Sequence, residues 1–260
     1  MNLFLDAIAW IFAPQNWQPG GVSPLPIQDR LLEHLLYTVV AVVIAAAIAL
    51  PLGFYIGHTG RGRQFVIGFT GAMRALPTLG VLFFLTMVLG ALVKGNSGIF
   101  WGTTIALVLL AIPSILAGAY AGLESVSRPA IDAARSIGMT EMQILTRVEI
   151  PLALPLIIGG LRAGTLQVIA TAVIASYAGL GGLGRIISSG IGLNDYDRIL
   201  GGAILVTAFA LVVDALFAIV QRLTRGPGAV SGGRGNRFRR RASRPETVVE
   251  TPTQERNVTA

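Results

Sequence analysis

Runs of apolar residues long enough to cross a lipid bilayer recur five times along the chain. A spanning helix needs about 20 mostly apolar residues, because a hydrocarbon core roughly 30 Å thick is crossed at about 1.5 Å per residue. The five runs are residues 35–57, 76–92, 101–123, 152–177 and 199–221, and the second is compatible with an interfacial lead-in from Phe65. Prolines inside three runs do not exclude helices, because neighbouring helices satisfy the backbone groups that a proline frees. The pattern therefore predicts an all-α integral membrane protein with a five-helix transmembrane bundle.

The two ends of the chain differ from this bundle, which would occupy residues 31–225. Near the N-terminus an apolar stretch is too short to span, and no cation precedes Arg30, so it lacks the basic start of a signal peptide. We expect residues 1–30 to form an extracytoplasmic interfacial segment with Trp10 and Trp17 near the headgroups. A leader that packs on nothing is the alternative. Residues 226–260 are polar and rich in arginine, which predicts a disordered basic tail.

The distribution of cations predicts the orientation of the bundle, because lysine and arginine near spanning helices are retained in the cytoplasm. One side of the membrane would carry Arg61, Arg63, Arg74, Arg128, Arg135, Arg147 and the arginines from Arg222 to Arg256. The other side would carry Arg30, Lys94, Arg185 and Arg198. We therefore expect the N-terminus outside the cell and the C-terminus in the cytoplasm.

The composition is typical of a membrane protein and excludes several kinds of functional site. Hydrophobic residues make up 53% of the chain and charged residues 13%, and the mean hydropathy is +0.69. The absence of cysteine rules out disulfides, thiolate metal sites, iron–sulfur clusters and cysteine nucleophiles. The two histidines, His34 and His58, stand at opposite ends of the first run, too far apart to share a metal. No metal site is expected.

A glycine-rich segment invites a nucleotide-binding interpretation that its context excludes. Gly179, Gly181 and Gly184 fit G-x-G-x-x-G, but they follow a spanning run where a dinucleotide fold needs a strand. With Gly182 they more plausibly form a tight extracellular re-entrant turn, a candidate gate facing the translocation path. A P-loop is excluded as well, because the single lysine, Lys94, follows a valine. We therefore expect no cofactor in this chain, and a separate ATPase would bind any ATP and magnesium.

Two ionisable residues lie inside predicted spans, Arg162 in the fourth and Asp214 in the fifth. Counted from the cytoplasmic ends, their depths agree within one helical turn, so an ion pair is geometrically possible. A structural pair, a place on the substrate path and snorkelling to the surface are the alternatives. Aromatic residues are sparse, at 7%, and no run holds a cluster of them. A cage for a quaternary ammonium group is therefore expected on a partner and not on this chain.

The longest connection between runs, residues 124–151, begins with the pattern of a short helix. Ser127 can cap its first turn, which contains Pro129, and a glycine at position 138 can end it in a left-handed conformation. The cation count places this connection in the cytoplasm. We expect the helix to project from the membrane there as one half of a rigid unit.

The second half of this connection has the pattern of another short helix. Thr140 with Gln143 matches a capping box, and the helix is predicted to close at Pro151. Two helices joined by a glycine corner offer apolar and charged faces that suit a groove on a cytosolic partner. An ordinary solvated connector is the alternative for the same residues.

This connection resembles the EAA loop of permease subunits of ATP-binding-cassette importers. The family pattern is Glu-Ala-Ala, three residues, Gly, nine residues, Ile, one residue, Leu-Pro. The corresponding residues here are Asp132, Ala133, Ala134, Gly138, Val148, Ile150 and Pro151, with unchanged spacing and conservative changes at Asp132, Val148 and Ile150. In that family the loop is the coupling helix that docks into a cleft of the ATPase subunit. The resemblance implies this role for residues 132–151, including Met139.

The resemblance extends from the first run to the fifth and points to the osmoprotectant branch of these permeases. Residues 179–204 are similar to the corresponding segment of glycine betaine, carnitine and choline permeases, and residues 75–82 to the entry of their second span. Methionine-importer permeases share the five-span layout and a similar glycine turn, so an amino-acid substrate stays open.

The resemblance also implies the partners and the location of the chain. They are cytosolic ATPase subunits, a second identical or similar permease subunit, and an extracytoplasmic substrate-binding protein, in the cytoplasmic membrane of a prokaryote and without nucleic acid. The chain itself would not be an enzyme, because its acidic residues near the membrane surface fit a docking loop better than a catalytic cluster. A channel or secondary transporter that works alone is the alternative of another class, although no internal repeat is visible.

Overall fold

The computed structural model describes residues 3–19, 25–93 and 95–224, and every regular element in these ranges is helical. The long helices are α2 (Ile27–Thr59), α5 (Asn96–Glu124), α8 (Ile150–Ala175) and α10 (Tyr196–Thr224). The shorter elements are α1 (Leu3–Phe12), η1 (Pro14–Asn16), α3 (Arg63–Ala75), α4 (Thr78–Leu92), α6 (Arg128–Ser136), α7 (Glu141–Ile144), η2 (Leu145–Glu149), η3 (Ser176–Ala178) and α9 (Gly184–Leu193). The all-α prediction is confirmed. The predicted disordered tail, residues 226–260, lies outside the described residues.

Four of the predicted runs coincide with helices that are long and apolar enough to cross a membrane. The second run does not, because α4 is a helix of 15 residues that is bent by 86° from α3. At about 1.5 Å per residue, α4 alone reaches about 22 Å, less than a hydrocarbon core of about 30 Å. The bend follows from Pro77, since the residue before a proline avoids the helical region and Leu76 has ψ 135°. The described chain therefore has four candidate spans, or five if α3 and α4 together form a broken one.

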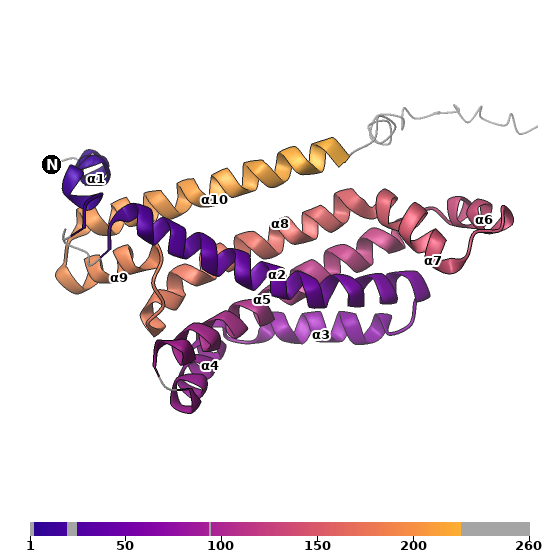
Figure 1. Ribbon diagram of the computed structural model, residues 1–260, viewed down its shortest axis with the longest axis horizontal. Coiled ribbons are helices and arrows are strands. Elements are labelled where there is room, and N and C mark those ends of the chain that lie inside the picture. Colours follow the sequence, from indigo (N-terminus) through magenta and orange to yellow (C-terminus); the bar gives the residue numbers. More distant parts are fainter. Residues whose placement is uncertain (1–2, 20–24, 94, 225–260) are drawn as a thin grey trace, which may run out of the picture. The chain divides into compact units, whose positions relative to one another are not determined.

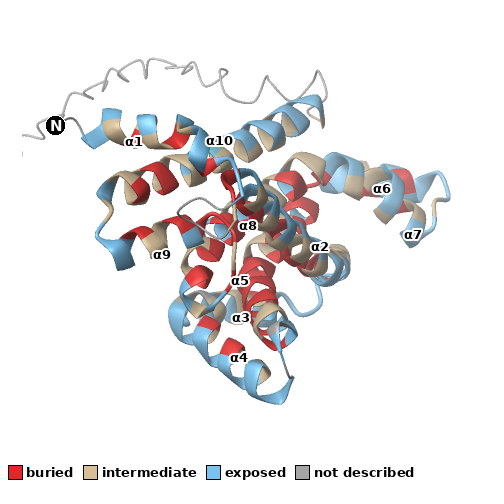
Figure 2. Ribbon diagram, turned by 60° about the vertical axis from the view of Figure 1, so that its left-hand side comes forward, coloured by how far each residue is buried: buried red, intermediate tan, exposed pale blue. Residues whose placement is uncertain are grey.

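The core of the bundle lies along α5, which packs against α2, α4 and α8. Figure 2 shows many buried residues along α5 and α8, whereas α4 is mostly exposed. The closest approach joins α5 and α8 at Gly118 and Gly160. A Cβ atom added to Gly118 would lie 2.5 Å from the Cα atom of Gly160, and one added to Gly160 would lie 2.7 Å from the Cα atom of Gly118. Only glycine at both positions allows the two backbones to touch in this way.

Replacing Gly118 with leucine is expected to destabilise this helix crossing by about 1–3 kcal/mol, because the new side chain overpacks a backbone contact. The measurement is the temperature at which the detergent-solubilised chain loses its monodisperse elution peak. Gly71→Leu is the matched control, since nothing lies within 4 Å of a Cβ added to Gly71 in α3. Equal transition temperatures for the two variants would contradict the prediction.

The short helices gather at the two ends of the long ones. Figure 1 shows α6 and α7 at one end, called the loop end below, and α1 and α9 at the other, called the turn end. At the turn end α1 packs on α10, where Trp10 covers Gly201 so closely that an added Cβ would lie 2.7 Å from its ring. A leader without contacts, the alternative considered for this segment, therefore does not describe α1.

Candidate functional site

The loop end is built from the two short helices that the sequence predicts. Helix α6 ends where Gly138 adopts φ +84°, and the N–H of Met139 donates to the carbonyl of Ala134 at 3.2 Å, as in a helix-ending glycine motif. Helix α7 begins with the predicted capping box between Thr140 and Gln143, which is confirmed. The side chain of Ser127, by contrast, makes no capping hydrogen bond to α6.

The prediction that the second short helix closes at Pro151 is wrong. Helix α7 continues through the π-helical turn η2 directly into α8, and the N–H of Ile150 donates to the carbonyl of Leu145, five residues earlier. A π turn widens the helix just before Pro151, the residue that has no N–H to donate and whose ring would crowd a narrower turn. As a result, one helical rod runs from Glu141 to Ala178.

An apolar underside holds the loop against the ends of the long helices. Ile131 and Ala134 of α6 and Ile144 of α7 are buried in one cluster with Leu123 and Ala153. Among the residues of the EAA-like pattern, Ala134 is buried, whereas Met139, Val148 and Ile150 are half-buried against the same cluster. Asp132, Ala133, Gly138 and Pro151 are exposed. The pattern thus divides into residues that fix the loop and residues that face outward.

Two exposed apolar side chains at the tip of the loop were missed by the sequence analysis. Ile137, next to the glycine corner, is 80% exposed, and Met142, in the first turn of α7, is 68% exposed. Neither side chain therefore contributes to the packing that holds the loop.

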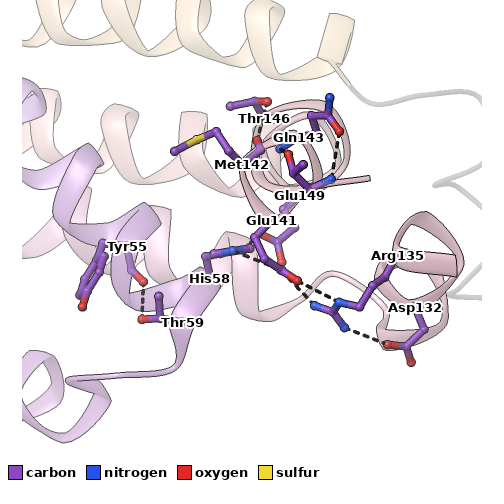
Figure 3. A network of polar contacts seen from close by, with 11 residues as sticks. Tyr55, His58, Thr59, Asp132, Arg135, Glu141, Met142, Gln143, Thr146 and Glu149 are labelled. Carbon is purple, nitrogen blue, oxygen red and sulfur yellow. Dashed lines mark hydrogen bonds and ion pairs between the residues drawn. The ribbon is translucent and has the colours of Figure 1, made fainter. Parts of the chain in front are cut away.

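A chain of polar contacts ties the loop to the end of α2 (Figure 3). The Nδ1 atom of His58 lies 2.5 Å from a carboxylate oxygen of the buried Glu149, and its Nε2 atom lies 3.6 Å from Glu141. Arg135 of α6 donates two hydrogen bonds to Glu141, at 2.9 and 3.0 Å, and lies 3.5 Å from Asp132. The hydrogen bond from Arg135 lowers the pKa of Glu141, and the same bond raises the pKa of Arg135. The chain of contacts therefore joins α2, α6, α7 and η2.

The predicted intramembrane residues meet in the structure. Arg162 of α8 donates from Nε and Nη2 to the two carboxylate oxygens of Asp214 of α10, each at 2.6 Å. This planar, two-bond arrangement is the geometry that arginine and a carboxylate prefer. Both donors of this fork point at Asp214, so snorkelling of Arg162 to the surface is not what the structure shows.

The glycine segment at the turn end is a tight turn held against α2. Gly179 and Gly182 have φ +99° and +78°, and a Cβ on Gly184 would clash with the backbone of Val173. The N–H of Gly182 donates to Glu33 at 2.7 Å, and a Cβ on Gly181 would clash with the same carboxylate. Within this segment, Gly181 and Gly182 are the glycines that approach the Glu33 carboxylate. Sequence reasoning missed Glu33, since no local pattern links it to a turn so far along the chain.

These features define a multi-pass helical membrane protein with two short, packed helices at one end. Within the described ranges, no group of three His, Asp or Glu side chains is placed to hold a metal ion. Residues 49–226 match the family described as the binding-protein-dependent transport system inner membrane component. The chain belongs to this family, the membrane components of ATP-binding-cassette transporters.

Curated relatives cover most of the chain. It is 35% identical over 190 residues to the glycine betaine/carnitine/choline transport system permease protein OpuCB of Bacillus subtilis (strain 168), covering 73% of this chain and 84% of the relative. It is 38% identical over 196 residues to the carnitine transport permease protein OpuCB of Listeria monocytogenes, covering 74% and 85%. Among solved structures, an inward-facing conformation of the MetNI methionine transporter matches with a TM-score of 0.67 and 20% identity, over 77% of this chain and 96% of that chain. The last likeness concerns the fold alone.

Proposed function

We propose that this chain is the permease subunit of an importer for small osmoprotectants that carry a quaternary ammonium group. Family membership and the names of relatives that are 35% and 38% identical support the substrate class. Glycine betaine, carnitine and choline are the candidate substrates. The loop end lies in the cytoplasm in this proposal, and the turn end faces the substrate-binding protein outside.

The packed loop is the observation that carries the mechanism. Its underside is fixed by Ile131, Ala134 and Ile144, whereas Ile137 and Met142 are exposed beside the glycine corner. A cytosolic ATPase subunit that binds ATP and magnesium docks on this exposed face. Because α7 is continuous with α8, a movement of the docked ATPase is transmitted into a spanning helix. A second permease subunit, identical or similar, completes the transport path.

The docking face is tested by capture of the ATPase from native membranes in mild detergent. Ile137→Asp introduces a charge into an apolar contact, so the amount of co-purified ATPase activity is expected to fall about tenfold. Ile191→Asp is the matched control, because Ile191 is an isoleucine of α9 that is 49% exposed at the turn end. Equal capture by Ile137→Asp and wild type would contradict the docking assignment.

The substrate class is tested by uptake into proteoliposomes that contain the purified importer and its binding protein. We expect ATP-dependent accumulation of labelled glycine betaine, carnitine or choline, and none of methionine. Uptake of methionine without any quaternary ammonium compound would assign the chain to an amino-acid importer. Uptake that needs no ATP would support a carrier that works alone.

A further inference from the structure

A cavity of about 400 Å³ lies at the turn end, away from the docking loop. Helix α2 contributes Arg30, Glu33 and Tyr37 to its wall, and α5 contributes Phe100. The glycine turn and Arg185 of α9 complete the wall. Its volume falls within the range of about 300–1,000 Å³ that is usual for small-molecule sites. Neither the docking loop nor the Arg162–Asp214 pair contributes to it.

The charged groups of this wall are arranged as two poles. At one pole the Glu33 carboxylate is held in place by Arg30 at 2.8 Å and by the N–H of Gly182 at 2.7 Å, while its side chain stays 28% exposed. At the other pole Arg185 is exposed, and its guanidinium has no carboxylate partner in the part of the chain that the structure describes. A ligand that bridges these poles needs a cation for Glu33 and an anion for Arg185.

Aromatic rings stand beside the negative pole, contrary to the expectation that this chain holds no aromatic cluster. The rings of Tyr37 and Phe100 lie 5.9 Å apart at 57°, and those of Phe100 and Trp101 lie 5.2 Å apart at 79°. The sequence analysis searched within single runs, whereas this cluster joins α2 and α5. Aromatic faces attract quaternary ammonium groups, which cannot donate hydrogen bonds and so gain little from polar walls.

We propose that this cavity is a binding site in the permease for a zwitterion that carries both a quaternary ammonium group and a carboxylate. The ammonium group lies against Tyr37 and Phe100 near Glu33, and the carboxylate binds Arg185. This assignment rests on the proposed function for its substrate class and adds a place on the permease where that substrate binds. It also predicts a ranking, because choline has the ammonium group but no carboxylate and therefore cannot use Arg185.

The test measures equilibrium binding of labelled glycine betaine and choline to the purified full chain in nanodiscs, without ATPase or binding protein. Arg185→Gln is expected to weaken glycine betaine binding about tenfold or more, since a charge-assisted hydrogen bond is lost, and to leave choline binding unchanged. Tyr37→Leu is expected to weaken both ligands, and Tyr37→Phe, which keeps the ring, is expected to retain both. The matched controls are Arg147→Gln in the loop and Tyr55→Leu, whose side chain is exposed on the same helix.

The outcomes separate this site from the proposed function. Saturable glycine betaine binding by wild type that Arg185→Gln and Tyr37→Leu leave unchanged overturns the site. Absence of saturable binding in an importer that still accumulates glycine betaine in proteoliposomes also overturns the site, and leaves the proposed function intact. Uptake and binding of methionine alone would overturn both. Equal elution volume and thermal stability of each variant and wild type exclude loss of folding as the cause.

Discussion

Replacing Gly138 with valine should abolish capture of the ATPase and ATP-driven uptake while leaving the bundle folded. Gly138 has φ +84°, a left-handed conformation that costs other residues roughly 1–2 kcal/mol and is least accessible to a β-branched side chain. Nothing lies within 4 Å of a Cβ added there, so the effect comes from the backbone and not from a clash. The corner would open, and α6 and α7 would no longer be held in their present arrangement. ATPase activity recovered per permease is the measurement.

Asparagine at the same position provides the matched control for this experiment. It tolerates the left-handed conformation better than any other residue with a side chain, apart from aspartate, and adds no charge. Gly138→Asn should therefore keep most of the captured ATPase, although it adds more atoms to the corner than valine does. Equal losses of captured ATPase by the asparagine and valine variants would show that docking excludes any side chain at position 138. The left-handed backbone conformation would then not be the cause. If the valine variant captures as much ATPase as the wild type, the turn at Gly138 has no role in docking.

Replacing Asp214 with leucine should cause the largest loss of folded protein. The change leaves the half-buried Arg162 guanidinium, within a predicted span, without the carboxylate that accepts its two 2.6 Å hydrogen bonds. An unpaired charge at that depth is among the most costly features of a membrane helix, so the yield of monodisperse permease should fall roughly tenfold. The measurement is the elution profile of a fluorescently tagged chain from solubilised membranes.

Two double variants decide what the pair does. The exchange Arg162→Asp with Asp214→Arg should restore much of the yield, and failure to do so would show that the pair does not account for the loss. Leucine at both positions should also restore folding, because removing both partners leaves no stranded charge. If the double-leucine permease folds and transports, the pair is structural. If it folds but does not transport, the pair lies on the substrate path.

Proline shows how far the sequence specifies this fold. The helix pair α3 and α4 is bent by 86° at Pro77, yet helices continue through Pro51, Pro113 and Pro155. A proline alone therefore does not determine whether a helix ends, because neighbouring helices also satisfy the backbone groups that it frees. Four of the five predicted runs, by contrast, coincide with long apolar helices, because the length of an apolar run is a property of the local sequence.

The candidate sites differ in whether they depend on local or on distant contacts. The capping box at Thr140 and the corner at Gly138 depend on residues a few positions apart, and both are present as predicted. The contact of His58 with Glu149 joins residues 91 positions apart, and the Tyr37–Phe100 pair joins two different helices. Each of these contacts depends on how α2 packs, which periodicity does not specify. Sequence reasoning therefore located the loop but not the polar contacts that tie it to α2.

The Gly118–Gly160 crossing lies near the middle of the continuous helical rod from Glu141 to Ala178, so the rod extends about equally far on both sides of it. Gly160 lies about 28 Å along the rod from its first residue and about 27 Å from its last, at about 1.5 Å per residue. The crossing therefore lies near the middle of the rod, where the two glycine backbones touch, and the side chain of Ile115 packs close to Gly164 about one turn further along. If the rod tilts as a unit about this point, a push on α7 produces an opposite displacement of nearly equal size at the glycine turn. A displacement of α7 by a docked ATPase would then reach the far side of the membrane with nearly the same amplitude.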